Sequence, residues 1–347
     1  MGIMESAPLR VLVILAALVI VIAGVQAAQP ILVPFLLSGF IAIIAVPPMV
    51  WLHRRKAPWW LAVTLIVLAL LLMVAIVGGI VGASVAEFRA RIPDYQLRLK
   101  DEAAVLVLAL RQYGVQLPDN GFADYLDPGA ALGLAGRVLS GFGNVLTDGV
   151  LILLTVIFIL LEAAVLPAKL RAIFDDPETS LGRLSTIAVN VQRYMEIKTV
   201  ISILTGLFVG IWTSLLGVDF PVVLGLLAFL LNYVPNIGSL IAAVPAVLLA
   251  FVELGIGTAV VTGLGYIVVN TVMGSVIEPR FMGRGLGLST LVVFLSLLFW
   301  GWVLGPVGML LSVPLTMTVK IALDANEQSR WLAILLGSDT KGSSGQA

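Results

Sequence analysis

The sequence predicts an all-α polytopic membrane protein, and its composition is the first reason. Hydrophobic residues make up 60% of the 347 residues and charged residues 12%, against about 45–50% and about 25% in an average soluble domain. So few charges cannot cover a water-exposed surface. The second reason is a series of long runs without Asp, Glu, Lys or Arg, since each such side chain costs about 2.5–3.5 kcal/mol at the bilayer centre.

Six stretches predict full membrane spans, because a spanning helix needs about 20 residues; the fourth of them has Asp148 and Glu162 toward its ends. Gln29, Pro30 and Pro34 divide the opening uncharged stretch into two helices, and the other spans follow in order. The predicted spans are 11–28, 31–51, 57–86, 145–166, 199–218 and 254–277. We interpret the first as a retained span and not as a cleaved leader, because the second begins a few residues after it.

Two further uncharged runs, 220–252 and 285–319, have lengths that suit neither one helix nor two full crossings. They have 33 and 35 residues, whereas two crossings with a turn need about 42 or more. Pro235 and Pro306 lie near their middles, close to glycines, and proline inside a helix removes a donor and clashes with the preceding turn. We predict two membrane-embedded helical hairpins; two pairs of short, complete spans are the alternative.

The two runs also resemble each other in pattern. Each has an apolar stretch, a Pro/Gly tip and a second apolar stretch that ends in Val-Pro, at Pro245 and at Pro314. Paired broken helices place backbone dipoles at mid-membrane and point to a transport site. Chance similarity between two apolar runs is the alternative.

The basic loop after the second span sets the predicted orientation. Residues 53–56 read His-Arg-Arg-Lys, and the positive-inside rule places them in the cytoplasm. Both termini are then cytoplasmic, the two hairpins enter from opposite faces, and a small helical segment with an amphipathic part at 94–111 lies outside.

The predicted domains are a three-span unit (1–86), this extracytoplasmic segment (87–147), a transport core (148–323) and a cytoplasmic tail (324–347).

The composition also excludes several functions. The 20 basic and 20 acidic residues cancel, so net charge does not favour nucleic acid as a partner. The chain has no cysteine, and His53 is its only histidine. Thiolate or His-rich metal sites and Ser-His-Asp catalysis are therefore excluded. We expect a protein that is not an enzyme, with no catalytic residues, metal or cofactor.

Polar side chains within the apolar runs are the candidate substrate contacts, because an unsatisfied polar group is costly in hydrocarbon. The candidates are Asn232, Asn236 and Ser239 around the first tip, Asn270 in the next helix, and Ser296 and Pro306 in the second hairpin. For the amides, hydrogen bonding that holds helices together is the alternative.

Charged residues at the inner end of the span 254–277 suggest a gate. Glu278, Arg280 and Arg284 place one acid beside two bases, and a desolvated ion pair there would break and re-form during opening. A solvated cytoplasmic loop is the alternative. Acidic residues elsewhere, such as Asp219 and Glu253, lie near span ends, so we expect no buried carboxylate pair for cation exchange.

Three motifs resemble the signature regions of the autoinducer-2 exporter family. They are NYVPNIGS (232–239), EPRFMGRGLGLST (278–290), and FWGW (299–302) followed by GPVGMLLSVP (305–314). The likeness extends from about residue 9 to residue 336. It implies a secondary transporter of the inner membrane that exports a small polar signal, autoinducer-2, and it supplies no catalytic residues to carry over.

Two other functions stay open. The family includes members proposed as sodium or lithium/proton antiporters, so the resemblance implies antiport as the main alternative. A non-transporting membrane scaffold whose outer segment binds a partner is the alternative from another class. We further expect a homo-oligomer, with the outer segment (87–147) as a contact between copies.

Overall fold

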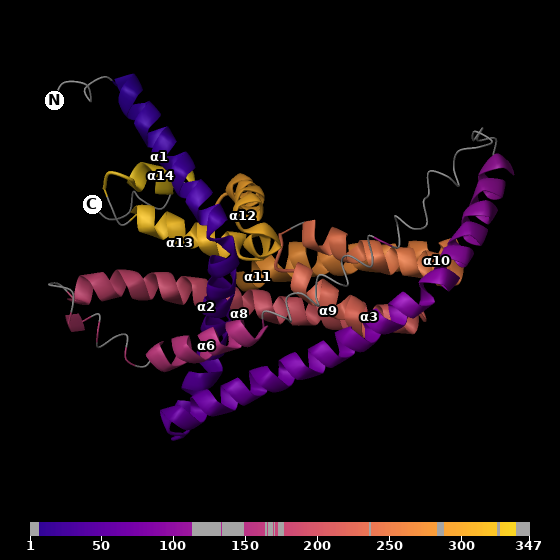
Figure 1. The fold of residues 1–347 in the computed structure, drawn as a ribbon, viewed down its shortest axis with the longest axis horizontal. Coiled ribbons are helices and arrows are strands. Elements are labelled where there is room, and N and C mark those ends of the chain that lie inside the picture. The colour runs from indigo at the N-terminus through magenta and orange to yellow at the C-terminus, as the bar shows by residue number, and fades with distance from the viewer. Residues whose placement is uncertain are drawn as a thin grey trace. The chain divides into compact units, whose positions relative to one another are not determined.

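The structure is a computed structural model, and it describes residues 7–112, 133, 149–163, 165, 169, 171–172, 177–235, 237–282, 288–324 and 327–337. The regular structure in these ranges is helical (Figure 1). The elements are α1 (Ala7–Ala27), α2 (Gln29–Arg54), α3 (Trp59–Gln112), α6 (Gly149–Ala163), α8 (Pro177–Leu215), α9 (Pro221–Leu231), α10 (Ile237–Asn270), the π-helix η2 (Thr271–Ile277), α11 (Glu278–Met282), α12 (Thr290–Leu310), α13 (Ser312–Asp324) and α14 (Arg330–Leu335).

Apolar length confirms the predicted membrane class. Five helical stretches in the described ranges are long and apolar enough to cross a bilayer: Gln29–Arg54, Trp59–Asp101, Val189–Leu215, Ile237–Phe281 and Thr290–Leu310. Large apolar side chains are exposed along them, for example Leu72 at 62% and Ile267 at 62%. Such side chains would be unfavourable in water, and they are what a lipid-facing surface requires.

The chain forms two compact units, each assembled from separate stretches of sequence. The first contains the described residues within Met1–Trp51, Leu154–Gln192 and Gly287–Ala347, and the second those within Leu52–Leu153 and Arg193–Leu286. In the first unit α12 packs on α1 and α13, and α13 packs on α14. In the second unit α10 packs on α3 and α9, and α3 also contacts α9.

Helix α3 is longer than the span predicted within it. The apolar run ends at Ala86, but the helix continues to Gln112 with Pro93 inside it, so its 54 residues extend about 81 Å at 1.5 Å per residue. Charged residues end an apolar run without ending a helix, and Glu87 and Arg91 form an i,i+4 ion pair that supports it. The predicted amphipathic part, 94–111, is therefore a continuation of α3.

The first predicted break lies between α9 and α10. Because Pro235 has no N–H, it cannot donate to the carbonyl of Leu231, and that carbonyl accepts instead from Val234 N at 2.9 Å. A Cβ atom on Gly238 would lie 1.8 Å from the same carbonyl oxygen, so the turn requires glycine there. With 11 residues, α9 is about 16 Å long, roughly half of a hydrocarbon core of about 30 Å. Its depth in the membrane stays a prediction.

Helix α10 contains the boundary that the sequence predicts between residues 252 and 254. Gly255 has φ 83° and ψ −179°, a backbone conformation that side chains with a Cβ rarely adopt. The helix therefore has two arms, one before Gly255 that packs with α9, and one after it that continues into η2.

The second predicted break lies inside α12, at Gly305 with φ 68°. Pro306 cannot donate to the carbonyl of Trp302, and the side chain of Gln26 donates to that carbonyl at 3.2 Å. Across the break, Trp300 Nε1 donates to Thr316 Oγ1 at 2.9 Å, which connects α12 to α13. The chain therefore folds back on itself in this run as it does in the first.

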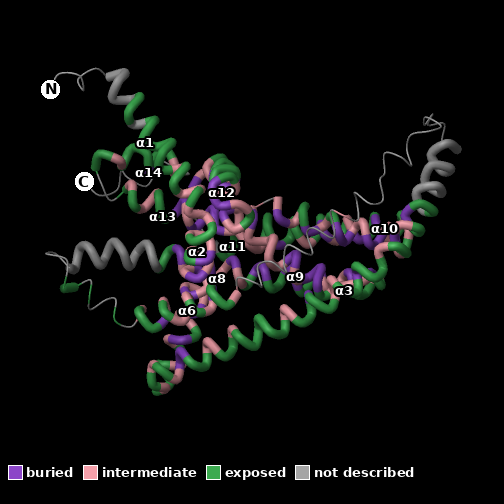
Figure 2. The backbone as a smooth tube through the Cα atoms, in the orientation of Figure 1, coloured by how far each residue is buried: buried purple, intermediate pink, exposed green. Residues whose placement is uncertain are grey.

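The buried residues of the second unit follow α9 and α10 (Figure 2). Leu224 and Leu227 of α9 and Ala246, Leu249 and Ala250 of α10 are at most 1% exposed. They form one apolar cluster to which α3 contributes aromatic side chains. The first hairpin is thus a core element of this unit, although α9 has only 11 residues.

Candidate functional site

The tip between α9 and α10 is hydrogen-bonded to α8. Asn232 Nδ2 donates to Ser202 Oγ at 2.9 Å, and the hydroxyls of Tyr233 and Thr199 are 2.7 Å apart. Neutral groups therefore connect the broken helix to its neighbour at two adjacent points. Within an apolar surrounding, such groups are also able to exchange partners with a hydroxyl-bearing solute at little cost, since each lost bond is replaced by another.

Three glycines on α8 and α9, at a distance from the tip along both helices, allow the two helices to approach closely. A Cβ atom on Gly225 would lie 2.6 Å from Gly206 O and 3.2 Å from Gly210 Cα, and one on Gly206 would lie 2.7 Å from Gly225 O. Small residues at four-residue spacing permit this kind of backbone contact between membrane helices. The glycines therefore fix the distance between α8 and the hairpin, and with it the reach of Asn232 to Ser202.

Beside the tip, α8 carries a buried ion pair. Lys198 Nζ donates to both carboxylate oxygens of Glu278, at 2.7 and 2.9 Å. The Lys198 side chain is 4% exposed and that of Glu278 is 20% exposed. Tyr194, one turn before Lys198, is also buried. Arg280 and Arg284 are the partners that the sequence predicts for Glu278. Among the described residues its ion pair is with Lys198, while Arg284 lies outside them and its part stays a prediction.

Glu278 is held by an unusual piece of helix. Its backbone N–H bonds to Met273 O, five residues earlier, at the end of the seven-residue π-helix η2. π-Helical turns are rare and occur frequently at functional sites. The element that presents Glu278 to Lys198 is therefore one whose hydrogen-bond register differs from that of the helices on either side.

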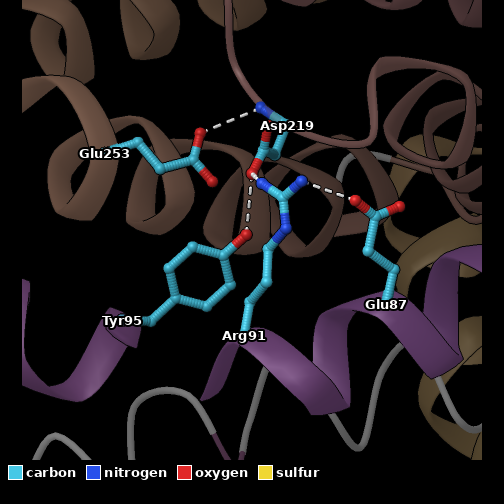
Figure 3. Close-up of polar contacts among 5 residues, drawn as sticks. All are labelled: Glu87, Arg91, Tyr95, Asp219 and Glu253. Carbon is cyan, nitrogen blue, oxygen red and sulfur yellow. Dashed lines mark hydrogen bonds and ion pairs between the residues drawn. The ribbon is translucent and has the colours of Figure 1, made fainter. Parts of the chain in front are cut away.

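At the other end of α9, a second polar cluster joins α3, the turn before α9 and α10 (Figure 3). Asp219 Oδ2 accepts from Arg91 at 2.5 Å and from the Tyr95 hydroxyl at 2.8 Å. The backbone N–H of Asp219 donates to Glu253 Oε2 at 2.9 Å, while Arg91 also binds Glu87 at 2.5 Å. We call Glu87, Arg91, Tyr95, Asp219 and Glu253 the Asp219 cluster.

The Asp219 cluster corrects one expectation. From their positions near span ends, Asp219 and Glu253 gave no sign of forming a pair, but the first arm of α10 brings Glu253 back to the start of α9. Glu253 Oε1 is buried and has no hydrogen-bond partner among the described residues. The two carboxylates are therefore neighbours in a partly buried setting, with Arg91 as the cation beside them.

Each of the two sets of charged contacts joins residues that the sequence predicts to lie on one side of the membrane. The sequence assigns the Asp219 cluster residues to the outside, and Lys198 and Glu278 to the inside. In the structure, each set makes its contacts within itself. Which set is cytoplasmic stays a prediction from the positive-inside rule.

The predicted substrate contacts have different surroundings. Asn232 is bonded to Ser202 as above, Ser239 is half-buried in the first turn of α10, and Asn270 is exposed at the end of α10. In the first unit, Ser296 is 7% exposed and donates to Val293 O at 2.8 Å in its own helix, and Pro306 follows the break at Gly305. Asn236 and Arg284 lie outside the described residues, and Arg280 is exposed.

Lys198, Thr199 and Ser202 on α8, and Gln26 at the second break, are not among the site residues that the sequence predicts. One signal was available: Tyr194, Lys198 and Ser202 recur every four residues and so share a helix face. In the part of the chain that the structure describes, no group of three or more His, Cys, Asp or Glu residues is placed to hold a metal ion.

Comparisons with known proteins agree on one family. The family model described as AI-2E family transporter matches residues 13–328. The chain is 40% identical over 333 residues to a protein of Escherichia coli (strain K12) named AI-2 transport protein TqsA, which covers 96% of this chain and 97% of that relative. It is 40% identical to a putative transport protein of Haemophilus influenzae, over 94% of this chain and 96% of that relative. It is 36% identical to the E. coli (strain K12) putative transport protein YhhT, over 96% and 95% of the two chains.

Proposed function

The chain belongs to the AI-2E transporter family, and on that premise we propose that it exports autoinducer-2 from the cytoplasm across the inner membrane. The observation that carries the proposal is its 40% identity, over 96% of the chain, to a relative named AI-2 transport protein. Neutral hydrogen-bonding groups at the first tip support it, because a small polyhydroxylated solute is recognised by amide and hydroxyl groups.

In this proposal each of the two breaks provides contacts for the solute within its own unit. Asn232, Asn236 and Ser239 contact it from the first hairpin and Asn270 from the helix that follows. In the other unit, Ser296 and the backbone around Pro306 are the contacts that the second hairpin offers a solute. Backbone groups at broken helices are the groups that membrane transporters use for this purpose. We place both termini in the cytoplasm, and we retain Glu278, with Arg280 and Arg284 nearby, at the inner gate.

A second candidate function, sodium or lithium/proton antiport, is favoured by the Asp219 cluster. A partly buried carboxylate pair is the usual device for exchanging a cation against a proton. However, Asp219 Oδ2 is already bound by Arg91 and Tyr95, and a guanidinium beside a carboxylate opposes the binding of another cation. We therefore rank export of the neutral signal first.

Efflux from proteoliposomes tests the proposal. Purified protein is reconstituted into vesicles loaded with autoinducer-2, and the signal that appears outside is followed over time. We expect efflux well above that of protein-free vesicles, because export down a gradient requires no second substrate.

A parallel assay decides between the two functions. The same vesicles, with a pH-sensitive dye inside, are given a sodium or lithium gradient. Under the proposal no proton movement follows. Retention of autoinducer-2 together with cation-driven proton movement would establish antiport instead.

A further inference from the structure

Among the residues whose burial is described, Lys198 is the one that is both charged and buried, at 3% exposure. Removing a lysine from water is costly, and the attraction of a carboxylate repays this cost only in part. An ion pair in such a position is thus weak evidence of a stabilising role. The contacts around Lys198 indicate another function for it.

The contacts of α8 join Lys198 to the first tip. Thr199, the next residue, bonds to Tyr233, and Ser202, one turn later, bonds to Asn232. A short stretch of α8 therefore holds the tip and the carboxylate of Glu278 at the same time. Movement of either would be transmitted to the other through one rigid helix turn.

Glu278 follows an element whose hydrogen-bond register differs from that of its neighbours. It follows η2, whose N–H groups bond five residues back where α10 and α11 use four. A conversion of η2 to α-helical pitch would rotate the residues that follow it and carry Glu278 away from Lys198. Because Lys198 then remains buried without its partner, the separated state is costly unless another polar group takes the place of the carboxylate.

We propose that Lys198 positions Glu278 and that the Lys198–Glu278 pair closes the access path to the tip, separating each time a solute passes. The proposal rests on the proposed function only in that this tip takes part in transport. It assigns the closing contact to Lys198 on α8, in place of the arginines that follow Glu278 in sequence. When the pair is open, the ammonium of Lys198 is available to bind a polyhydroxylated solute. The same helix carries the hydroxyls of Tyr194, Thr199 and Ser202, which offer the solute further hydrogen bonds.

A cysteine-access experiment tests this proposal without any substrate. The chain contains no cysteine, so a single reporter, Val234→Cys, can be added directly at the tip, where Val234 is 4% exposed. Inside-out vesicles are treated with a membrane-impermeant maleimide, and the labelling rate is measured. We expect Lys198→Gln and Glu278→Gln each to raise the rate about tenfold, which corresponds to about 1.4 kcal/mol of lost closing free energy. The exchanged pair Lys198→Glu with Glu278→Lys, or the conservative Lys198→Arg, should restore most of the slow labelling.

A second reporter separates an open gate from an unfolded protein. Val218→Cys, 2% exposed and next to Asp219, is labelled from the opposite face in right-side-out vesicles. An open gate leaves this rate unchanged or lowers it, whereas a purely structural defect raises both rates together. Equal rises at both reporters, or single variants that label at the wild-type rate, would overturn the proposal. Failure of autoinducer-2 efflux would leave the labelling result unaffected, so the two proposals can fail independently.

Discussion

Replacing Gly225 with alanine should abolish transport and markedly lower the thermal stability of the protein. The added Cβ would lie 2.6 Å from Gly206 O and 3.2 Å from Gly210 Cα, and both are backbone atoms that cannot move aside by changing a rotamer. Helices α8 and α9 must therefore separate. Overpacking of this kind typically costs about 1–3 kcal/mol, and here it also moves Asn232 away from Ser202. Unfolding in detergent and efflux from proteoliposomes measure the two effects.

Glycines with open surroundings provide the matched controls for Gly225→Ala. A Cβ on Gly79 in α3 or on Gly257 in α10 meets nothing within 4 Å, and alanine in a helix is favoured over glycine by about 0.5–1 kcal/mol. Gly79→Ala and Gly257→Ala should therefore be neutral or stabilising. If Gly225→Ala were as stable and active as these controls, the close contact between α8 and α9 would be refuted.

The second large effect is expected for Asp219→Asn. The substitution keeps the size of the side chain but removes the charge that Arg91 and Tyr95 both bind. Tyr95 is 3% exposed, and a hydrogen bond from such a group to a charged acceptor contributes about 1.5–3 kcal/mol. The variant should unfold at a lower temperature, and transport should fall several-fold because the start of α9 loses its attachment to α3.

Glu87→Gln is the matched control, since it removes the other carboxylate that binds the same arginine. Glu87 and Arg91 lie one turn apart on α3 and their side chains are 52% and 45% exposed, so solvent screens the pair. We expect no measurable loss of stability or transport for Glu87→Gln. Equal losses in the two variants would show that the Asp219 contact does not hold α9 to α3.

The breaks in the two uncharged runs were predictable because their cause is local. Pro235 and Pro306 lack the N–H that the carbonyl four residues earlier requires, and the helices are interrupted at these points. Gly255, with its left-handed backbone, lies next to Glu253, where the sequence predicts that one element ends and the next begins. Proline removes a backbone donor and glycine permits a left-handed backbone, and here the two residue types occur together near the middle of an uncharged run. Proline alone would not have been enough, because Pro93 lies inside α3 without ending it.

The polar contacts at the candidate site were not predictable in the same way. Lys198 and Glu278 are 80 residues apart, and Asp219 and Glu253 are 34 apart. Their meeting depends on how α8, α10 and η2 pack. The sequence assigned Glu278 to the arginines that follow it because nearness along the chain is the information that a sequence provides. The length of α3 was not predictable for another reason. An apolar run indicates how much of a helix lies in the membrane, and α3 continues beyond its apolar run to Gln112.

The central claim, that the tip between α9 and α10 contacts the exported solute, is tested most directly by autoinducer-2 efflux from proteoliposomes containing Asn232→Ala. The account predicts a loss of about fivefold or more, since one hydrogen bond contributes about 1 kcal/mol. A smaller loss is expected for Ser202→Ala, which removes the partner of Asn232 but leaves its amide, and none for Asn190→Ala, an exposed asparagine of α8. Efflux through Asn232→Ala at the rate of Asn190→Ala would contradict the claim.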